Sequence, residues 1–281
     1  MIFLIGGSGR LGQAIARQHA GASVTVLPRA LYAHWGEPGA HHEVAEYFAP
    51  WAGSGSVVYV TSGLLDPRLA PEEHARVNVA LPLNIVEGAA SLGLKVRTFG
   101  TVMETLMASQ NPYVRSKAEL GRRIAAASAS GLPVAHVRIH TLYGGGEPAS
   151  FMFLGQILSA LRAQAPFRMT LGRQLREYHH VDDDAAALAR LEETGLSGVV
   201  DLSHGAPLSL RALAETVFEA FGARAQLEVG ALPEPASDNF GAVLERPAAL
   251  ELAYFRDAAA GVVDYLKPYI LQPAVPTDDV H

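Results

Sequence analysis

The sequence contains no cysteine among its 281 residues. Disulfide bonds, thiol nucleophiles and zinc–thiolate centres are therefore excluded. No stretch reaches the roughly 18 consecutive apolar residues that a membrane-spanning helix requires. The N-terminal run MIFLIGG is too short for a signal peptide and has no basic region before it. We therefore expect a cytoplasmic protein with no membrane partner.

Lysine is also scarce, and acidic residues outnumber basic ones. The lysines are Lys95, Lys117 and Lys267, so arginine supplies 19 of the 22 basic residues. A net charge of −6 does not suit a general surface for nucleic acid or for anionic membranes. The hydrophobic fraction of 49% and the charged fraction of 18% are typical of a globular protein with a large core.

Short apolar runs alternate with amphipathic segments through the first half of the chain. Because several of these runs are apolar throughout, they predict strands of a parallel sheet that is buried on both faces. The predicted strands lie within residues 2–7, 22–30, 56–63, 94–102 and 132–144, and the predicted helices cover 10–20, 71–93 and the segment after Asn111. The pattern indicates an α/β fold with a Rossmann-type, doubly wound parallel sheet.

Two regions depart from this alternation. Residues 31–56 contain no convincing strand, and the stretch HHEVAEYFAPW within them is helical in pattern. After Gly144 we predict a strand inside 196–205 and helices at 150–165, at 209–222 with Ser209 as its cap, and at 250–266. We expect a dinucleotide-binding domain of residues 1–143 plus roughly 177–204, and a smaller, interwoven C-terminal substrate-binding lobe of residues 144–176 and 205–281.

Gly6, Gly9 and Gly12 follow the first predicted strand with the spacing G-x-x-G-x-x-G and open the first predicted helix. In such a turn the first glycine permits a tight bend, and the second lets the backbone approach a pyrophosphate. The third lets the helix pack closely on the strand. The amino end of the helix adds its dipole and its free N–H groups. This strand–turn–helix context predicts a dinucleotide-binding site.

The end of the second predicted strand bears on which dinucleotide is bound. An NAD site usually has Asp or Glu there to bind the ribose 2′-hydroxyl. This chain has Arg29 near that position and Arg10 inside the glycine turn. Because guanidinium groups bind phosphate oxygens, we predict NADP(H) as the cofactor. NAD(H) stays open as the alternative, in which both arginines are solvated surface residues.

Tyr113 and Lys117 are four residues apart in the stretch NPYVRSK. Asn111 is a good helix N-cap, Pro112 suits the first helical position, and the residues that follow are strong helix formers. On a helix, residues four apart lie on one face, so the phenol and the ammonium group can reach one site. The alternative is that both belong to an ordinary helix surface.

Together these motifs resemble those of the extended short-chain dehydrogenases/reductases, of the NAD(P)-dependent epimerase/dehydratase type that acts on nucleotide sugars. The resemblance covers most of the chain, in the stretches GGSGRLG, YVTSG, VNVALPLNIVEGAASLGLK, NPYVRSK, VRIHTLYGGG, REYHHVDD and LSHGAPLSLRALAE. Within that family, residues 138–183 are similar to nucleotide-sugar 4-ketoreductases such as CDP-abequose synthase.

The resemblance implies roles for individual residues. Tyr113 would be the general acid/base, and Lys117 would bind the nicotinamide ribose and lower the tyrosine pKa. Thr101 would bind the substrate oxygen, with Thr98 as the second choice. The implied cofactor-binding residues are Gly6, Gly9, Arg10, Leu11, Gly12, Arg29, Thr61, Ser62, Gly63, Asn78, Tyr113, Lys117 and His140.

The resemblance also implies substrate-binding residues, Thr141 and Arg176. Arg176 would clamp the substrate diphosphate, because arginine binds phosphate oxygens through two N–H groups at once. Its alternative role is an ion pair with the following Glu177.

The chain departs from the resembled pattern in informative places. The 4,6-dehydratases have adjacent Asp and Glu after the catalytic threonine, whereas this chain reads TVME from Thr101 to Glu104, so we do not expect dehydration. The connection from Thr101 to Tyr113 is short, so its loop must be trimmed. The adjacent His179 and His180 would point to different sides of a strand, and we predict no metal site.

We predict an NADP(H)-dependent oxidoreductase that acts on a nucleotide sugar, specifically a 4-keto-6-deoxyhexose reductase. One alternative is a nucleotide-sugar 4-epimerase with bound NAD, which uses the same Tyr113 and Lys117 and returns its hydride to the sugar. Another is a non-catalytic NADP(H) sensor. The resemblance further implies a homodimer that forms through two long helices per subunit, residues 71–92 and 112–128.

Overall fold

The computed structural model describes residues 1–106 and 110–271. Its central element is a six-stranded sheet with the order β10–β5–β4–β3–β1–β2, in which every neighbouring pair is parallel. The strands are β1 (Ile2–Ile5), β2 (Val24–Val26), β3 (Val57–Val60), β4 (Lys95–Thr101), β5 (Val134–Ile139) and β10 (Gly198–Asp201). This sheet, covered by helices, confirms the predicted Rossmann-type α/β fold.

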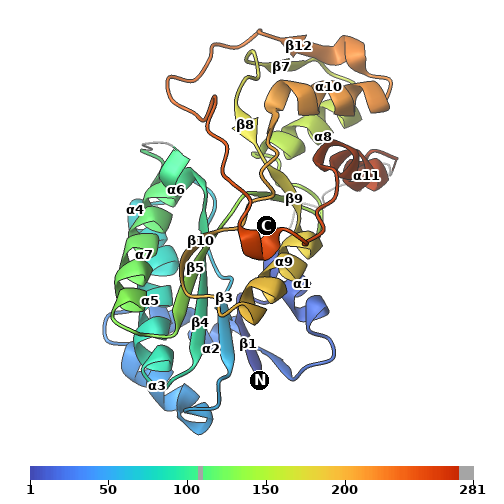
Figure 1. The fold of residues 1–281 in the computed structure, drawn as a ribbon. Coiled ribbons are helices and arrows are strands. Elements are labelled where there is room, and N and C mark those ends of the chain that lie inside the picture. The colour runs from blue at the N-terminus through green and yellow to red at the C-terminus, as the bar shows by residue number, and fades with distance from the viewer. Residues whose placement is uncertain (107–109, 272–281) are drawn as a thin grey trace. The chain divides into compact units, whose positions relative to one another are not determined.

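Helices cover both faces of the sheet (Figure 1). On one face α1 (Arg10–Gln18) packs against α9 (Val181–Glu193). The other face carries α3 (His41–Phe48), a long helix from residue 71 to residue 90, and α7 (Pro112–Ala129). Phe3, Leu4 and Ile5 in β1 are all fully buried between these layers. Burial on two faces explains why the strands read as continuous apolar runs.

The connections from β1 and β2 leave in opposite directions. After β1 the chain crosses to β2 on one side, and after β2 it returns to β3 on the other side of β1. Such a reversal creates a topological switch point at the carboxyl ends of the strands, which is where doubly wound sheets bind their ligands. The glycine turn and the segment after Val60 both begin at this point.

Residues 31–56 contain no strand, as the sequence predicts. They form α2 (Arg29–Tyr32), a 3₁₀ turn η1 (Ala33–Gly36), α3 and a second 3₁₀ turn η2 (Ala49–Trp51). Trp35 and Phe48 are buried in this region, and their ring centroids lie 6.1 Å apart. Aromatic side chains therefore form part of the core in this connection between β2 and β3.

The helix predicted at 71–93 is continuous but not uniformly α-helical. It consists of α4 (Pro71–His74), a π-helical segment η3 (Ala75–Ala80), α5 (Leu81–Ile85) and a second π-helical segment η4 (Val86–Ala90). The first wide turn precedes Pro82, whose missing N–H and bulky ring disfavour a regular α-helical turn.

The chain divides into two compact units. The first contains the sheet and comprises residues 1–140, 181–205 and 244–254, and the second comprises residues 141–180, 206–243 and the chain from residue 255. The second unit has its own core, in which Leu158, Leu213 and Phe218 are buried. Its elements are β6 (Thr141–Tyr143), α8 (Phe153–Ala163), β7 (Phe167–Met169), β8 (Leu175–Arg176), β9 (Tyr178–His180), β11 (Leu208–Ser209), α10 (Leu210–Ala220), η5 (Arg224–Gln226), β12 (Leu227–Val229) and α11 (Ala258–Leu271).

The prediction of a helix at residues 250–266 is wrong for the first half of that range. α11 begins only at Ala258, and residues 251–257 are irregular after a 3₁₀ turn η6 (Ala248–Leu250). The Arg246 guanidinium donates to the carbonyl oxygen of Leu250, at 2.8 Å, and to that of Ala253. Because a side chain satisfies these carbonyls, the segment does not need helical hydrogen bonds.

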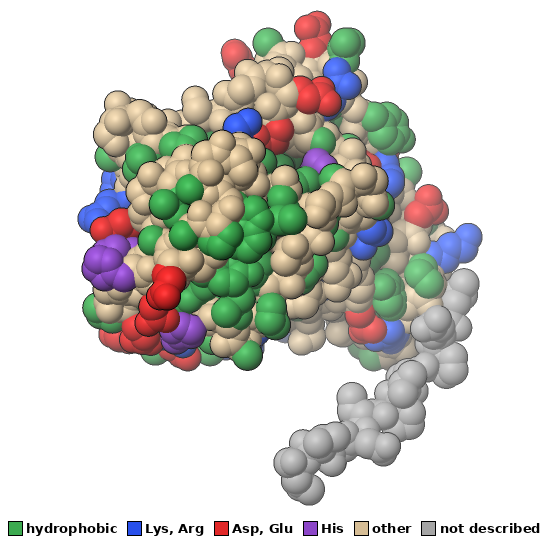
Figure 2. Space-filling model, turned by 90° about the horizontal axis from the view of Figure 1, so that it is seen from below, with side chains coloured by type: hydrophobic (Ala, Val, Ile, Leu, Met, Phe, Trp, Pro, Cys, Tyr) green, Lys and Arg blue, Asp and Glu red, His purple; other side chains and the backbone are tan. Residues whose placement is uncertain are grey.

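Hydrophobic side chains reach the surface of the first unit. Figure 2 shows such side chains gathered on the face that it views, with acidic and histidine side chains to one side. Among the helices described, none is long and apolar enough to cross a membrane. The partly buried hydrophobic residues that pack on the first core are Leu31, Tyr47, Trp51, Leu83, Leu92, Ala127 and Leu132.

Gly88 in η4 tests how tightly the long helix packs on α3. A Cβ atom there would lie 2.7 Å from the carbonyl oxygen of His41 and 2.7 Å from Cβ of Val44. We expect Gly88→Ala to lower the free energy of unfolding by about 1–3 kcal/mol, because the overpacked helices must separate. Urea denaturation measures the change, with Gly21→Ala as the control, since nothing lies within 4 Å of a Cβ atom at that position. Equal stability of the two variants would contradict the packing.

Candidate active site

The glycine turn after β1 is shaped by close backbone contacts. Gly6 has a φ of +82°, and a Cβ atom on it would overlap the backbone of Ser62. A Cβ atom on Gly12 would lie 2.6 Å from Cα of Gly7 and 2.9 Å from Oγ1 of Thr61. The first glycine therefore makes the tight bend, and the third brings α1 onto the sheet.

Gly9, between them, leaves space above the turn. It is exposed and is the N-cap of α1, and the nearest atom to an added Cβ would be the carbonyl oxygen of Gly6 at 3.3 Å. No side chain of the described residues hydrogen-bonds to this helix end as a cap. The backbone N–H groups of the first turn, with those of Leu11 and Gly12 among them, can therefore donate to a pyrophosphate, which the helix dipole also favours. The turn fits a dinucleotide.

The segment after β3 lies against this turn. Thr61 and Ser62 donate their backbone N–H groups to the carbonyl oxygen of Ile5, at 2.8 and 3.1 Å, and the Thr61 hydroxyl donates to the same oxygen at 3.0 Å. Gly63 comes next, and a Cβ atom on it would lie 3.4 Å from Nζ of Lys117. These residues therefore connect the glycine turn to the side chains of α7.

Arg10 and Arg29 begin the helices that follow two neighbouring strands. Arg10 is the first residue of α1, after the turn that leaves β1, and Arg29 is the first residue of α2, shortly after β2. Because β1 and β2 are parallel neighbours, both arginines follow the same edge of the sheet. Arg29 is exposed, and Arg10 is partly buried.

The start of α7 confirms the predicted cap. Oδ1 of Asn111 accepts a 2.9 Å hydrogen bond from the backbone N–H of Tyr113, and Pro112 occupies the first helical position. α6 (Met103–Leu106) precedes it. Residues 107–109, in the short connection between Thr101 and Tyr113, lie outside the described residues.

Thr101, Tyr113 and Lys117 come together where β4 ends. The Tyr113 hydroxyl lies near the side chain of Thr101, the last residue of β4, which favours the ionised phenol and so opposes the rise of the Tyr113 pKa. Lys117 is buried one helical turn further along α7, and its Nζ donates to the carbonyl oxygen of Phe99 in β4 at 2.8 Å. This arrangement places a phenol, a hydroxyl and an amine in the unit that also contains the glycine turn.

Burial changes the proton affinity of both α7 groups. Burial and, to a smaller extent, the Glu104 carboxylate raise the pKa of Tyr113, and the nearby Thr101 side chain opposes them only in part. Burial lowers the pKa of Lys117 to about 8, although Glu104 acts in the opposite direction. Desolvation of the phenolate dominates in the protein alone, and the lowered tyrosine pKa that the resemblance implies for the site with its nicotinamide stays a prediction.

Asn78 is fully buried and holds the loop after β3. Its Oδ1 accepts from the N–H of Leu64 at 2.8 Å, and its Nδ2 donates to the carbonyl oxygen of Leu64 at 3.0 Å. Nδ2 also donates to Oγ of Ser116 in α7 at 3.0 Å and lies 3.2 Å from Nδ1 of His74. The side chain joins the long helix, the loop and α7, so it can serve the cofactor site by positioning these segments.

Thr98 and His140 differ from Thr101 in their surroundings. The Thr98 side chain is buried, and its hydroxyl lies 2.8 Å from Nδ1 of His136 in β5. Thr98 is therefore engaged inside the sheet. His140 directly follows β5 and is partly buried.

In the second unit, Thr141 and Arg176 lie on separate strands. Thr141 begins β6, and its N–H donates to the carbonyl oxygen of Glu177 at 3.2 Å. The Arg176 guanidinium donates to Asp238 at 2.6 Å. The alternative prediction, an ion pair between Arg176 and Glu177, is therefore wrong, because Arg176 pairs with Asp238. The Glu177 carboxylate instead lies 2.9 Å from Nε2 of His179.

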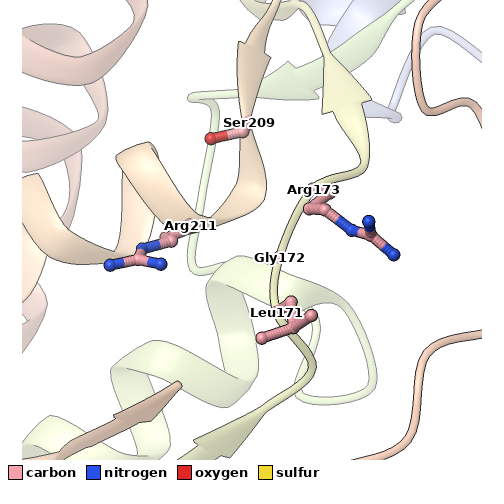
Figure 3. Close-up of a pocket in the computed structure, with 5 residues that line it drawn as sticks. All are labelled: Leu171, Gly172, Arg173, Ser209 and Arg211. Atoms are coloured by element: carbon pink, nitrogen blue, oxygen red, sulfur yellow. The ribbon is translucent and has the colours of Figure 1, made fainter. Parts of the chain in front are cut away.

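A shallow hollow in the second unit is lined by Leu171, Gly172, Arg173, Ser209 and Arg211 (Figure 3). Its two guanidinium groups extend away from each other. Arg211 donates to Glu215 at 3.0 Å, and Arg173 lies 3.8 Å from Glu234. The hollow therefore lacks a converging pair of cations for a diphosphate.

The sequence analysis did not predict a buried pair of Glu104 and His136, which lies between α7 and the sheet. Oε1 of Glu104 accepts from the backbone N–H of Thr101 at 2.7 Å and lies 3.4 Å from Nε2 of His136. The His136 side chain is fully buried, and that of Glu104 is 4% exposed. A histidine inside the apolar strand VAHVRI is the available signal, but nothing local identifies its partner, which lies 32 residues away.

Residues 2–200 match the NAD dependent epimerase/dehydratase family, so the match spans both the glycine turn and the Tyr113–Lys117 pair. The chain belongs to this family. Membership confirms the predicted NAD(P)-dependent epimerase/dehydratase type and shows an NAD-dependent enzyme class. None of the curated proteins matches the sequence.

Solved structures share the fold at low sequence identity. The Thermotoga maritima UDP-glucose 4-epimerase with UDP-glucose is 17% identical, with a TM-score of 0.76 over 95% of this chain and 97% of that one. The Thermus thermophilus UDP-glucose 4-epimerase with NAD is 19% identical, with a TM-score of 0.72 over 95% and 98%. A dTDP-glucose 4,6-dehydratase from Streptomyces venezuelae with NAD is 17% identical, with a TM-score of 0.75 over 96% and 97%.

The environment of Lys117 predicts an unusually acidic ammonium group. Because burial lowers its pKa to about 8, we expect Lys117 to lose its proton as the pH rises through 8, well below the roughly 10.4 of a free lysine. ¹⁵N NMR of lysine-labelled protein measures this directly, and the Lys117→Gln variant assigns the resonance by its loss. A Lys117 titration near the free value would contradict the described burial.

Proposed function

We propose that this enzyme is an NADP(H)-dependent reductase of a nucleotide-linked keto sugar, with a 4-keto-6-deoxyhexose as its substrate. The observation that carries the proposal is the Tyr113 hydroxyl beside Thr101, one helical turn from buried Lys117, in the unit that holds the glycine turn. A phenol held in this way is suited to protonate a carbonyl oxygen.

Each residue of the site has a part in this reaction. The bound cofactor supplies the hydride. The turn at Gly9 and Gly12 would hold its pyrophosphate, and Lys117 would hold its nicotinamide ribose. Thr101 would donate a hydrogen bond to the ketone oxygen, and Tyr113 would transfer its phenolic proton to the same oxygen as it becomes an alcohol. The phenol is protonated at neutral pH, as an ordinary phenol is and as a proton donor must be.

The acid groups near Tyr113 favour reduction over dehydration. Elimination of water from a sugar needs an acid that reaches the leaving hydroxyl. Glu104 is the carboxylate nearest in sequence to Thr101, but its side chain is 4% exposed and is held by the Thr101 N–H and His136. It is therefore not presented to a substrate in the way that an eliminating acid must be.

The choice of NADP(H) is supported by Arg10 and Arg29. They begin helices after two adjacent parallel strands, at the edge of the sheet where the adenosine half of a dinucleotide binds in this type of fold. Two guanidinium groups there favour a 2′-phosphate over a 2′-hydroxyl. The family is NAD dependent, so a preference of this enzyme for NADP(H) over NAD(H) requires a direct comparison of the two cofactors.

The nucleotide-sugar part of the proposal is supported by the related structures. Those named above are described as enzymes of UDP-glucose and dTDP-glucose. In this chain, Arg176 is 20% exposed at its side chain and can bind a diphosphate beside its contact with Asp238.

A nucleotide-sugar 4-epimerase with bound NAD is the second candidate, because two of the similar structures are UDP-glucose 4-epimerases. It would use Tyr113 and Lys117 in the same places but return the hydride to the sugar. Purified protein that carries NAD and interconverts two sugars without added cofactor would favour it. The NADP(H) sensor would need no proton donor at all.

The homodimer stays part of the proposal. The helix of residues 71–90 and α7 pack against each other on one face of the sheet, so each subunit can offer two helices to a second copy. Sedimentation equilibrium of the purified protein distinguishes this dimer from a monomer.

The reductase is tested with NADPH and a panel of CDP-, dTDP-, GDP- and UDP-linked 4-keto-6-deoxy sugars. We expect loss of nicotinamide absorbance with one of these nucleotides, and a lower KM for NADPH than for NADH. Oxidation of neither cofactor by any of the sugars would contradict the reductase. Preference for NADH would contradict the role given to Arg10 and Arg29.

Tyr113→Phe tests the proton donor. Removal of a general acid costs about 10²- to 10⁴-fold in rate, so we expect kcat to fall by that factor while binding of NADPH is retained. Tyr254→Phe is the matched control, because Tyr254 is 74% exposed in the same unit and its hydroxyl has no part in the site. Full activity of Tyr113→Phe would contradict the mechanism, and retained NADPH binding without turnover in the unaltered protein would favour the sensor.

A further inference from the structure

The loop after β3, residues 61–70, is held from its inner side by the long helix. Gly63 in this loop is exposed, and a Cβ atom on it would lie 3.4 Å from Nζ of Lys117, so the loop borders the candidate site. The loop contains neither helix nor strand, so its inward-facing backbone groups need side chains as hydrogen-bond partners. Two buried side chains of the long helix, His74 and Asn78, supply them.

The backbone of the loop fixes the orientation of the Asn78 amide. Because the N–H of Leu64 can only donate and its carbonyl oxygen can only accept, Asn78 presents Oδ1 to the first, at 2.8 Å, and Nδ2 to the second, at 3.0 Å. Nδ2 also donates to Oγ of Ser116 at 3.0 Å, and the Ser116 hydroxyl donates to the carbonyl oxygen of Tyr113 at 2.8 Å. The amide of Asn78 therefore joins the loop to the first turn of α7.

His74 holds the loop through both of its ring nitrogens. Its Nε2 lies 3.0 Å from the carbonyl oxygen of Asp66, which can only accept, so Nε2 carries a hydrogen and donates. Its Nδ1 lies 3.2 Å from Nδ2 of Asn78, which can only donate, so Nδ1 carries no hydrogen and accepts. The two contacts together define one form of the ring, a neutral imidazole with its hydrogen on Nε2.

We propose that His74 is a positioning residue of the dinucleotide site, which holds the loop after β3 through the carbonyl group of Asp66 and the amide group of Asn78. The inference rests on the proposed function, because the loop borders the site that is given to the cofactor. His74 is buried and contacts neither cofactor nor substrate in this role. It sets the fraction of molecules in which the loop has its binding conformation, and the apparent affinity for a dinucleotide falls with that fraction.

Three variants test the role of His74. His74→Leu fills the space but removes both hydrogen bonds, whereas His74→Gln keeps one neutral donor and one acceptor on the same side chain. His42→Leu is the matched control, because His42 is exposed on α3 and takes no part in the loop. Two quantities are measured in each protein: hydrogen exchange of the Leu64 amide without cofactor, and the Kd for NADPH and for NADH from nicotinamide fluorescence.

We expect the Leu64 amide hydrogen to exchange about tenfold faster in His74→Leu, because the loop opens more often when its hydrogen bonds to His74 are lost. The Kd of the dinucleotide that the unaltered protein binds should rise by about the same factor. His74→Gln should restore most of both values, and His42→Leu should change neither. Restoration by an amide side chain identifies the hydrogen bonds, rather than the shape of the ring, as the cause.

Unchanged exchange at Leu64 in folded His74→Leu overturns the inference, and so does faster exchange with an unchanged Kd. Failure of the unaltered protein to bind either dinucleotide is a different result, which contradicts the proposed cofactor and the role of the loop with it. If His74→Leu does not fold, ¹⁵N NMR of the histidine-labelled unaltered protein at pH 8 tests the ring itself, with His74→Gln to assign its resonances. We expect the hydrogen on Nε2, and a hydrogen on Nδ1 would overturn the inference.

Discussion

The hydrogen bond from Nζ of Lys117 to the carbonyl oxygen of Phe99 ties α7 to β4, and the site depends on it. It holds α7 beside β4, and Tyr113, one turn earlier on α7, lies near Thr101, where β4 ends. It also keeps an amine in a buried place, where its pKa falls to about 8 and its charge depends on its neighbours. Those neighbours therefore determine whether Lys117 is charged.

One such neighbour is the carboxylate of Glu104. Burial alone would favour a neutral amine and a neutral phenol. The negative charge of Glu104 supports the ammonium form of Lys117 and further disfavours the phenolate of Tyr113. Gly100 and Gly121 leave the space that the Glu104 carboxylate occupies.

Local rules predict much of this structure. The turn at Gly6 and Gly12, and the helix start at Asn111, depend on residues close in sequence, so backbone geometry and capping rules suffice. The family match confirms the class of enzyme that the motifs indicate. The distant partners could not be predicted: Asp238 meets Arg176 across 62 residues, and His136 meets Glu104 across 32. The helical pattern at 250–257 failed for a similar reason, because the Arg246 side chain satisfies carbonyl groups there.

The central claim is that Tyr113 is the proton donor of a dinucleotide-dependent reduction. A crystal structure of the protein with NADP⁺ tests it most directly. The account predicts the pyrophosphate on the N–H groups of the turn at Gly9 and Gly12, with the nicotinamide ring in front of the Tyr113 hydroxyl and its ribose on Lys117. A dinucleotide bound away from the glycine turn, or a Tyr113 hydroxyl that faces away from the nicotinamide, would contradict it.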